Sequence, residues 1–134
     1  MRKSSKNSRI EWQSAPEIKR RVEAIVSSAG LDWVKKDNIQ CVRSTSANTR
    51  AVARIWGLGR IWQEVMGYPA GYIIEVVSEK FDKLSDREKD KVLMHELAHI
   101  PMNFSGAMLP HRRRGKGNFH DKLRKMMAAY DRRK

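Results

Sequence analysis

Residues 85–101 read SDREKDKVLMHELAHIP, a stretch that contains both a helix start and a helix end. Ser85 followed by Glu88 is a capping-box pattern, which predicts that a helix begins at this point. Pro101 cannot continue a helix, so the helix must end close to it. The stretch therefore predicts one helix with a defined start and end. The relative positions of its side chains then follow from helical periodicity.

The second half of this helix carries an HExxH motif, His95-Glu96-Leu97-Ala98-His99. Side chains four residues apart share one helix face, so His95 and His99 can reach the same ion. Zinc accepts imidazole nitrogen, and a catalytic zinc site takes three protein ligands and leaves one position open for water. Glu96 adjoins His95 without occupying the metal, which suits a general base acting on metal-activated water. The motif predicts a Zn²⁺ site with Glu96 as its catalytic residue.

Two histidines remain as candidates for the third metal ligand. All four histidines fall within residues 95–120, and no glutamate follows Glu96. His111 comes after a turn-rich loop that can fold back to the metal, whereas His120 lies inside the expected last helix. The sequence favours His111, and His120 is the alternative third ligand or a fourth ligand that would close the site.

The segments around the motif predict an α+β domain: a helix, about three mainly antiparallel strands, then two helices. The first helix is expected to begin with Ser14 as N-cap and Glu17 as its capping-box partner. The last helix is expected to begin at about Asn118. The other predicted features are a stop of the first helix at Gly30 and strands over residues 39–43, 52–56 and 72–77.

Excess positive charge gathers at both ends of the chain. The net charge is +13, yet residues 22–96 hold eleven basic and eleven acidic side chains. Residues 1–21 carry +5 and residues 97–134 carry +8. Basic ends on a neutral body are typical of contact with a polyanion such as RNA, the ribosome or DNA, and solvated tails without a partner are the alternative. The residues expected to bind it are Arg2, Lys3, Lys6, Arg9, Arg112, Arg113, Arg114, Lys116, Arg132, Arg133 and Lys134.

The chain is expected to hold a basic arm (residues 1–13), a single domain (residues 14–131) and a basic end (residues 132–134). It has no apolar run long enough to cross a membrane and no secretory signal. One cysteine, Cys41, excludes an internal disulfide and fits a reducing compartment, so a cytoplasmic location is expected. Cys41 is expected to be buried and inert. Trp56 and Trp62 are expected in the core, with base stacking as the alternative.

The motif and its flanks resemble a known family. Residues 92–101, 104–106 and 109–111 are similar to metallopeptidases of archaea and phages, which are themselves similar to SprT-like zinc proteases. In those proteases a Pro-His pair also follows the HExxH helix at a comparable distance. The likeness covers roughly residues 39–111. It implies a minimal zincin-like fold in which His95, His99 and His111 hold Zn²⁺ and Glu96 is the base.

Two functions of different class fit these features. The first is a zinc-dependent metallopeptidase that hydrolyses peptide bonds of a peptide or protein substrate, on or near nucleic acid. The second is a basic protein associated with nucleic acid or the ribosome, in which the zinc is structural and no proteolysis occurs. The number of protein ligands separates them, because a structural zinc site is closed by a fourth ligand.

Overall fold

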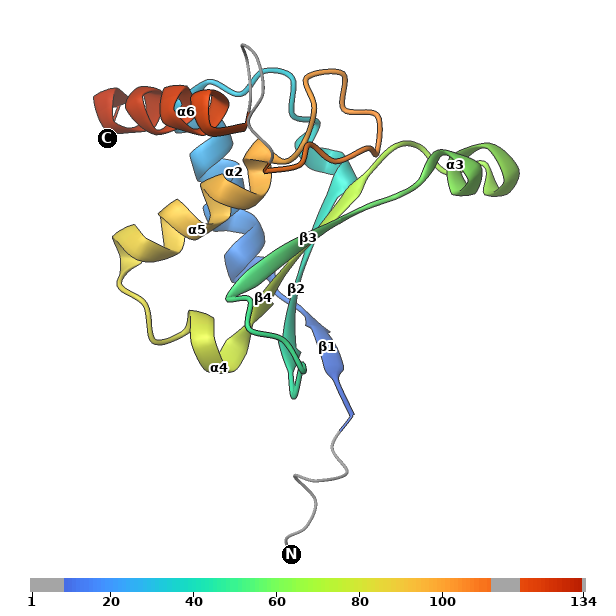
Figure 1. Cartoon of the computed structure of the whole chain (residues 1–134), viewed down its shortest axis with the longest axis horizontal. Coiled ribbons are helices and arrows are strands. Elements are labelled where there is room, and N and C mark those ends of the chain that lie inside the picture. Colours follow the sequence, from blue (N-terminus) through green and yellow to red (C-terminus); the bar gives the residue numbers. More distant parts are fainter. Residues whose placement is uncertain (1–8, 112–118, 134) are drawn as a thin grey trace, which may run out of the picture.

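The computed structural model describes residues 9–111 and 119–133 (Figure 1). Its helices and strands confirm the α+β class. Within the described ranges, no helix combines the length and the apolar character that crossing a bilayer requires. The helices are α2 (Pro16–Ala29), α3 (Arg60–Met66), α4 (Ser78–Phe81), α5 (Asp86–Ala98) and α6 (Phe119–Arg133), with a 3-10 turn at Lys36–Asn38. The strands are β1 (Glu11–Ser14), β2 (Ile39–Thr45), β3 (Ala53–Gly57) and β4 (Tyr72–Val77).

The strands form one mixed sheet in the order β1-β2-β4-β3. β1 pairs antiparallel with β2, β2 pairs parallel with β4, and β3 pairs antiparallel with β4. Two of these three pairings are antiparallel, as predicted, but the sheet has four strands instead of about three. The order places β1 and β3 at the two edges.

The additional strand is β1, and its residues 11–13 were predicted to belong to a solvated arm. They lie opposite Thr45, Ser44 and Arg43 of β2. All side chains of β1 are exposed. Its sequence therefore lacks the alternation of buried and exposed positions that predicts a strand. The prediction was wrong because backbone pairing with β2, and not side-chain burial, makes this segment a strand.

The helix ends follow local sequence at both ends of α5 and at the end of α2, but not at the start of α2. At α5, Ser85 Oγ accepts from the Glu88 backbone N–H at 3.2 Å, and the Glu88 carboxylate accepts from the Ser85 N–H at 3.0 Å. The helix ends at Ala98, and Gly30 ends α2 with a φ of 65°. At the start of α2, however, Ala15 is the N-cap and no side chain caps the helix. The predicted cap, Ser14, is the last residue of β1 instead.

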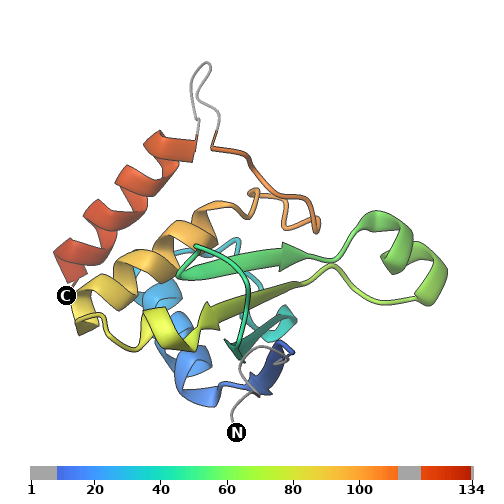
Figure 2. The same cartoon turned by 60° about the horizontal axis from the view of Figure 1, so that its bottom comes forward.

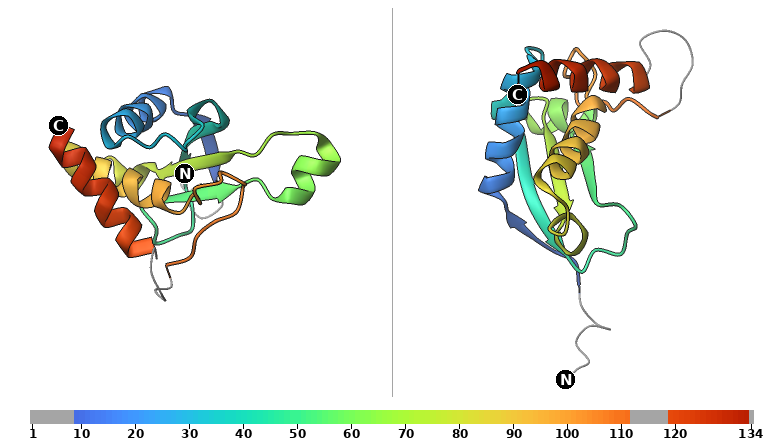
Figure 3. Two further views of the ribbon diagram at one scale, coloured as in Figure 1. Left: turned by 90° about the horizontal axis from the view of Figure 1, so that it is seen from above. Right: turned by 90° about the vertical axis from the view of Figure 1, so that its left-hand side faces the viewer.

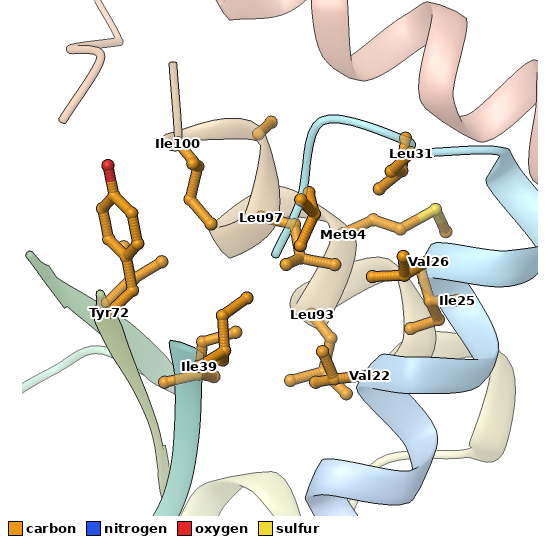
Figure 4. Packing of buried hydrophobic residues seen from close by; sticks show 14 of the residues in the cluster. Val22, Ile25, Val26, Leu31, Ile39, Tyr72, Leu93, Met94, Leu97 and Ile100 are labelled. Atoms are coloured by element: carbon orange, nitrogen blue, oxygen red, sulfur yellow. The ribbon is translucent and has the colours of Figure 1, made fainter. Parts of the chain in front are cut away.

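One face of the sheet packs against helices α2 and α5 to form the core (Figure 4). Ile39 and Tyr72 come from the sheet, Val22 from α2, and Leu93 and Leu97 from α5, and all five are buried. Helix α6 packs against both α2 and α5. This packing orients α5 relative to the sheet, because the apolar side of the helix can turn only toward the core.

Between β3 and β4 the chain leaves the sheet and forms α3, which projects from the rest of the molecule (Figures 2 and 3). Trp62 on α3 is 55% exposed and Trp56 on β3 is 49% exposed, so the prediction that both lie in the core is wrong. Trp56 points from the sheet face that the helices leave uncovered. Cys41 is buried, as predicted, and burial raises the pKa of its thiol to about 11.

The base of this projection is tied to the loop that follows α5. Gln63 Nε2 donates to the carbonyl oxygens of Leu58 and Ser105, each at 2.8 Å. The Tyr72 hydroxyl accepts from the Gly106 N–H at 2.8 Å. These bonds join the β3–β4 connection to the loop at the end of α5, so the loop has a defined path.

Replacing Gly106 by Ala should loosen this junction. Gly106 has a φ of 95°, and an added Cβ would lie 2.2 Å from the Leu58 carbonyl oxygen. We expect the free energy of unfolding to fall by at least about 2 kcal/mol in urea denaturation. Gly30→Ala is the matched control, because Gly30 also has a positive φ (65°) but an added Cβ would meet nothing within 4 Å. That variant should lose only about 1 kcal/mol, and equal losses would contradict the close contact at Gly106.

Candidate metal centre

Helix α5 presents His95 and His99 on one side and buries its opposite side. Leu93 and Leu97 are fully buried and anchor the helix in the core. The centroids of the two imidazole rings are 5.3 Å apart, as expected for neighbours one helical turn apart. His99 is also the C-cap residue, so the chain can turn away directly after the second histidine.

The loop after α5 returns to the helix end and brings His111 to the other two histidines. The Leu109 N–H donates to the His99 carbonyl oxygen at 2.7 Å. In return, His99 Nδ1 lies 2.6 Å from the Leu109 carbonyl oxygen. A carbonyl only accepts, so Nδ1 carries the proton and Nε2 of His99 keeps its lone pair. A bond of this kind fixes the tautomer and the orientation of a metal-binding imidazole.

Three imidazole nitrogens converge on one point. One nitrogen from each of His95, His99 and His111 lies within 4.8 Å of the others. Nε2 of His95 and Nε2 of His111 are 3.0 Å apart. Two nitrogens bound at ~2.0–2.1 Å to one tetrahedral zinc ion lie about 3.4 Å apart. Small movements of the side chains would therefore bring the nitrogens to the spacing that zinc requires. The three histidines are thus placed to hold a metal ion.

The surroundings keep the imidazoles of His95 and His99 in the form that binds metal. Burial lowers the pKa of His95 to about 4, and the nearby His99, His111 and His120 lower it further. Burial also lowers the pKa of His99, and the hydrogen bond to Leu109 opposes this effect. At neutral pH both rings are therefore uncharged. An uncharged imidazole offers a nitrogen lone pair, which metal binding requires.

Phe119, the first residue of α6, forms an apolar wall behind all three histidines. Its ring centroid lies 4.9 Å from that of His95, 4.5 Å from that of His99 and 4.9 Å from that of His111. Phe119 is 2% exposed. The sequence alone does not show which element Phe119 faces, because nothing in the spacing of the last helix indicates it.

Glu96 lies on α5 between the two histidines and lines the same cleft. Its side chain is buried, and burial raises the pKa of its carboxyl to about 7. A cation held by the neighbouring histidines would favour the carboxylate form. A carboxyl group that gains and loses its proton near neutral pH is suited to proton transfer.

A cleft of about 560 Å³ opens beside the histidines and Glu96. Residues 51–55, which lead into and form most of β3, make one wall, and Lys91 and Val92 of α5 contribute to the other. β3 is an edge strand that pairs only with β4 among the described strands. One side of an extended backbone therefore borders the cleft.

Among the other predicted site residues, the structure describes His120, Arg9 and Arg132. His120 is exposed on α6 and does not belong to the converging group. Arg9 and Arg132 are exposed, and α6 continues to Arg133. The predicted residues that lie outside the described part of the chain are Arg2, Lys3, Lys6, Arg112, Arg113, Arg114, Lys116, Lys134 and the side chain of Arg133.

Comparison with known proteins agrees with this geometry. Residues 10–128 match the family described as "Putative phage metallopeptidase". No curated protein and no solved structure matches the chain. The family match spans the whole sheet, the three converging histidines and most of α6. Since it covers most of the sequence, the chain belongs to this metallopeptidase family.

Proposed function

We propose that the protein is a zinc-dependent peptidase that cleaves peptide bonds by hydrolysis. The observation that carries the proposal is the convergence of His95, His99 and His111 in a cleft that also holds the carboxyl group of Glu96. Three imidazoles with a buried carboxyl beside them match the needs of a catalytic zinc site, which couples three protein ligands to a general base.

The number of available ligands favours a catalytic site over a structural one. In the described part of the chain, no fourth histidine, cysteine or acidic side chain joins the group of three. The sequence of the remaining residues, 1–8, 112–118 and 134, contains none of these residue types. A structural zinc site needs four protein ligands, so this composition opposes the alternative in which zinc only supports the fold.

Each residue of the site would have its own role in the reaction. His95, His99 and His111 would hold zinc, which when bound lowers the pKa of water and polarises a carbonyl oxygen. Glu96 would accept a proton from the attacking water as the water oxygen bonds to the carbonyl carbon. Glu96 would then return that proton to the amine nitrogen as the carbon–nitrogen bond breaks. The apolar ring of Phe119 would hold the imidazoles in place through these steps.

Strand β3 offers a binding surface for the substrate backbone. An extended peptide can add to an exposed sheet edge through main-chain hydrogen bonds. Because residues 51–55 border the cleft beside Glu96, a peptide lying along β3 would pass the catalytic carboxyl. Main-chain pairing gives affinity for extended segments, so an unstructured protein is the substrate to assay first.

Metal removal tests the proposal directly. The purified full-length protein is expected to hold about one zinc ion per chain and to cleave unfolded casein. Treatment with 1,10-phenanthroline should remove the zinc and abolish cleavage, and added Zn²⁺ should restore both. Mg²⁺ should not restore activity, because it prefers oxygen ligands to imidazole. Cleavage that persists after the zinc is gone would sink the proposal.

A further inference from the structure

The sheet face opposite the core carries an exposed aromatic surface. Four side chains line a hollow of about 470 Å³ there, namely Trp12, Val42, Ile73 and Trp56. They come from β1, β2, β4 and β3, so the surface crosses the whole sheet. Neighbours along a strand point to opposite faces, and residues adjoining these four, such as Cys41 and Ile74, are buried in the core.

The two tryptophans of this surface are open to solvent at opposite edges of the sheet. Trp12 is 55% exposed and Trp56 is 49% exposed. Ile73, between them, is 42% exposed. Large apolar side chains gathered on an exposed face mark binding surfaces in soluble proteins. The metal site uses none of these four residues.

A buried carboxylate holds Trp56 in place. Trp56 Nε1 donates to Glu75 Oε1 at 2.9 Å, and Arg54 Nε donates to the same oxygen at 2.9 Å. Glu75 is fully buried, and the Arg54 guanidinium lies 5.2 Å from the Trp56 ring centroid. A ring fixed in this way loses little side-chain entropy on binding. The ion pair also neutralises the one carboxylate of β4, so no unpaired negative charge from that strand faces the hollow.

Positive charge lies directly before this surface in the sequence. Residues 1–10 contain four basic and no acidic residues, and Trp12 follows two positions later. Arg9 is the described member of this group and is exposed. A ligand that matches both the aromatic face and the basic sequence before it must offer flat rings and negative charge together. A second copy of the chain does not, because each copy carries +13 and would repel the other.

We infer that this sheet face binds single-stranded nucleic acid, with bases stacked on Trp12 and Trp56. Stacking of bases on exposed aromatic rings beside a cationic track is how many proteins bind single strands. Duplex DNA keeps its bases stacked on one another, so it cannot use the two rings. The inference is independent of the peptidase chemistry.

The test measures binding of a fluorescein-labelled dT20 oligonucleotide to the full-length protein by anisotropy. Trp12→Ala and Trp56→Ala should each weaken binding roughly 5- to 150-fold, the range for loss of one stacked base. Trp62→Ala is the matched control, because Trp62 is as exposed as Trp12 but lies on α3. That variant should change the Kd less than 2-fold. An equal loss in all three variants, or none in the first two, would overturn the inference.

Further variants separate the effect of stacking from that of misfolding, and the salt dependence of binding tests the contribution of charge. Trp12→Phe and Trp56→Phe keep a ring for stacking and should retain most of the affinity, whereas misfolding would weaken both types of variant alike. The affinity for dT20 should fall steeply as the salt concentration rises, because basic side chains that bind phosphate release counterions. An affinity that does not change with salt would contradict a nucleic-acid ligand.

Two controls test the other possible ligands of this sheet face, namely duplex DNA and a second copy of the chain. A 20-base-pair duplex should bind much more weakly than dT20, and equal binding would overturn the stacking mode. Light scattering should show a monomer, and a dimer that Trp12→Ala dissociates would instead assign this face to a second copy. Glu96→Gln should bind dT20 like the unaltered protein while losing casein cleavage, so failure of one proposal is distinguishable from failure of the other.

Discussion

The Glu96→Gln variant is expected to keep its zinc and to cleave unfolded casein roughly 10²- to 10⁴-fold more slowly than the unaltered protein. The amide has nearly the size of the carboxyl group, so the buried position on α5 stays filled. It cannot accept a proton from water, however, and general-base catalysis is lost. Zinc content by mass spectrometry and initial rates of cleavage, measured on the same preparation, check both halves of the expectation.

Glu64→Gln provides the control for this variant. Glu64 lies on α3, where its exposed carboxylate pairs with Arg60 at 2.6 Å, and it does not line the cleft. The control should retain full zinc content and full activity. If Glu96→Gln also retained full activity, Glu96 would not be the general base, and the role would have to pass to another group at the cleft.

The second large effect is expected for His111→Ala, which should lose zinc. Two imidazoles on α5 would remain, and two ligands make a much weaker site than three. The affinity should fall by more than the roughly 10- to 100-fold that follows loss of an outer-shell partner. Competition with a zinc-chelating dye measures this affinity, and casein cleavage should disappear together with the zinc.

His120→Ala separates the two candidate third ligands. His120 adjoins Phe119 on α6 but is exposed and does not join the converging nitrogens. Its variant should bind zinc with unchanged affinity. Loss of zinc in His120→Ala with retention in His111→Ala would reverse the assignment. Equal loss in both would indicate a four-histidine site and would favour a structural metal.

Local sequence was sufficient to predict those features whose geometry is set within a single helix. The capping box at Ser85 and Glu88 and the four-residue spacing of His95 and His99 need no other part of the chain. Both features depend only on helical periodicity and on hydrogen bonds within one turn. The start and end of α5, the shared face of its two histidines and the neighbouring position of Glu96 could therefore be predicted.

Features that depend on contacts with a distant part of the same chain could not be predicted from local sequence. β1 has no buried side chain and exists because β2 offers an edge for backbone pairing. This pairing also removes Ser14 from its predicted capping role. Trp56 was predicted to lie in the core because the sequence does not show that the helices cover only one face of the sheet. Trp62 was predicted to lie there because the sequence does not show that α3 projects from the rest of the molecule.

By itself, then, the sequence determined the α+β class, the metal-binding motif on α5 and the charge of the chain ends, since each is a matter of composition or of spacing within one element. The tertiary structure decided which histidine stands beside His95 and His99, because His111 reaches them through a loop held by Leu109. It also decided that Phe119 backs the site and that β3 borders it. Contacts of this kind join residues distant along the chain, and only packing of α5 against α6 and the sheet sets their distances.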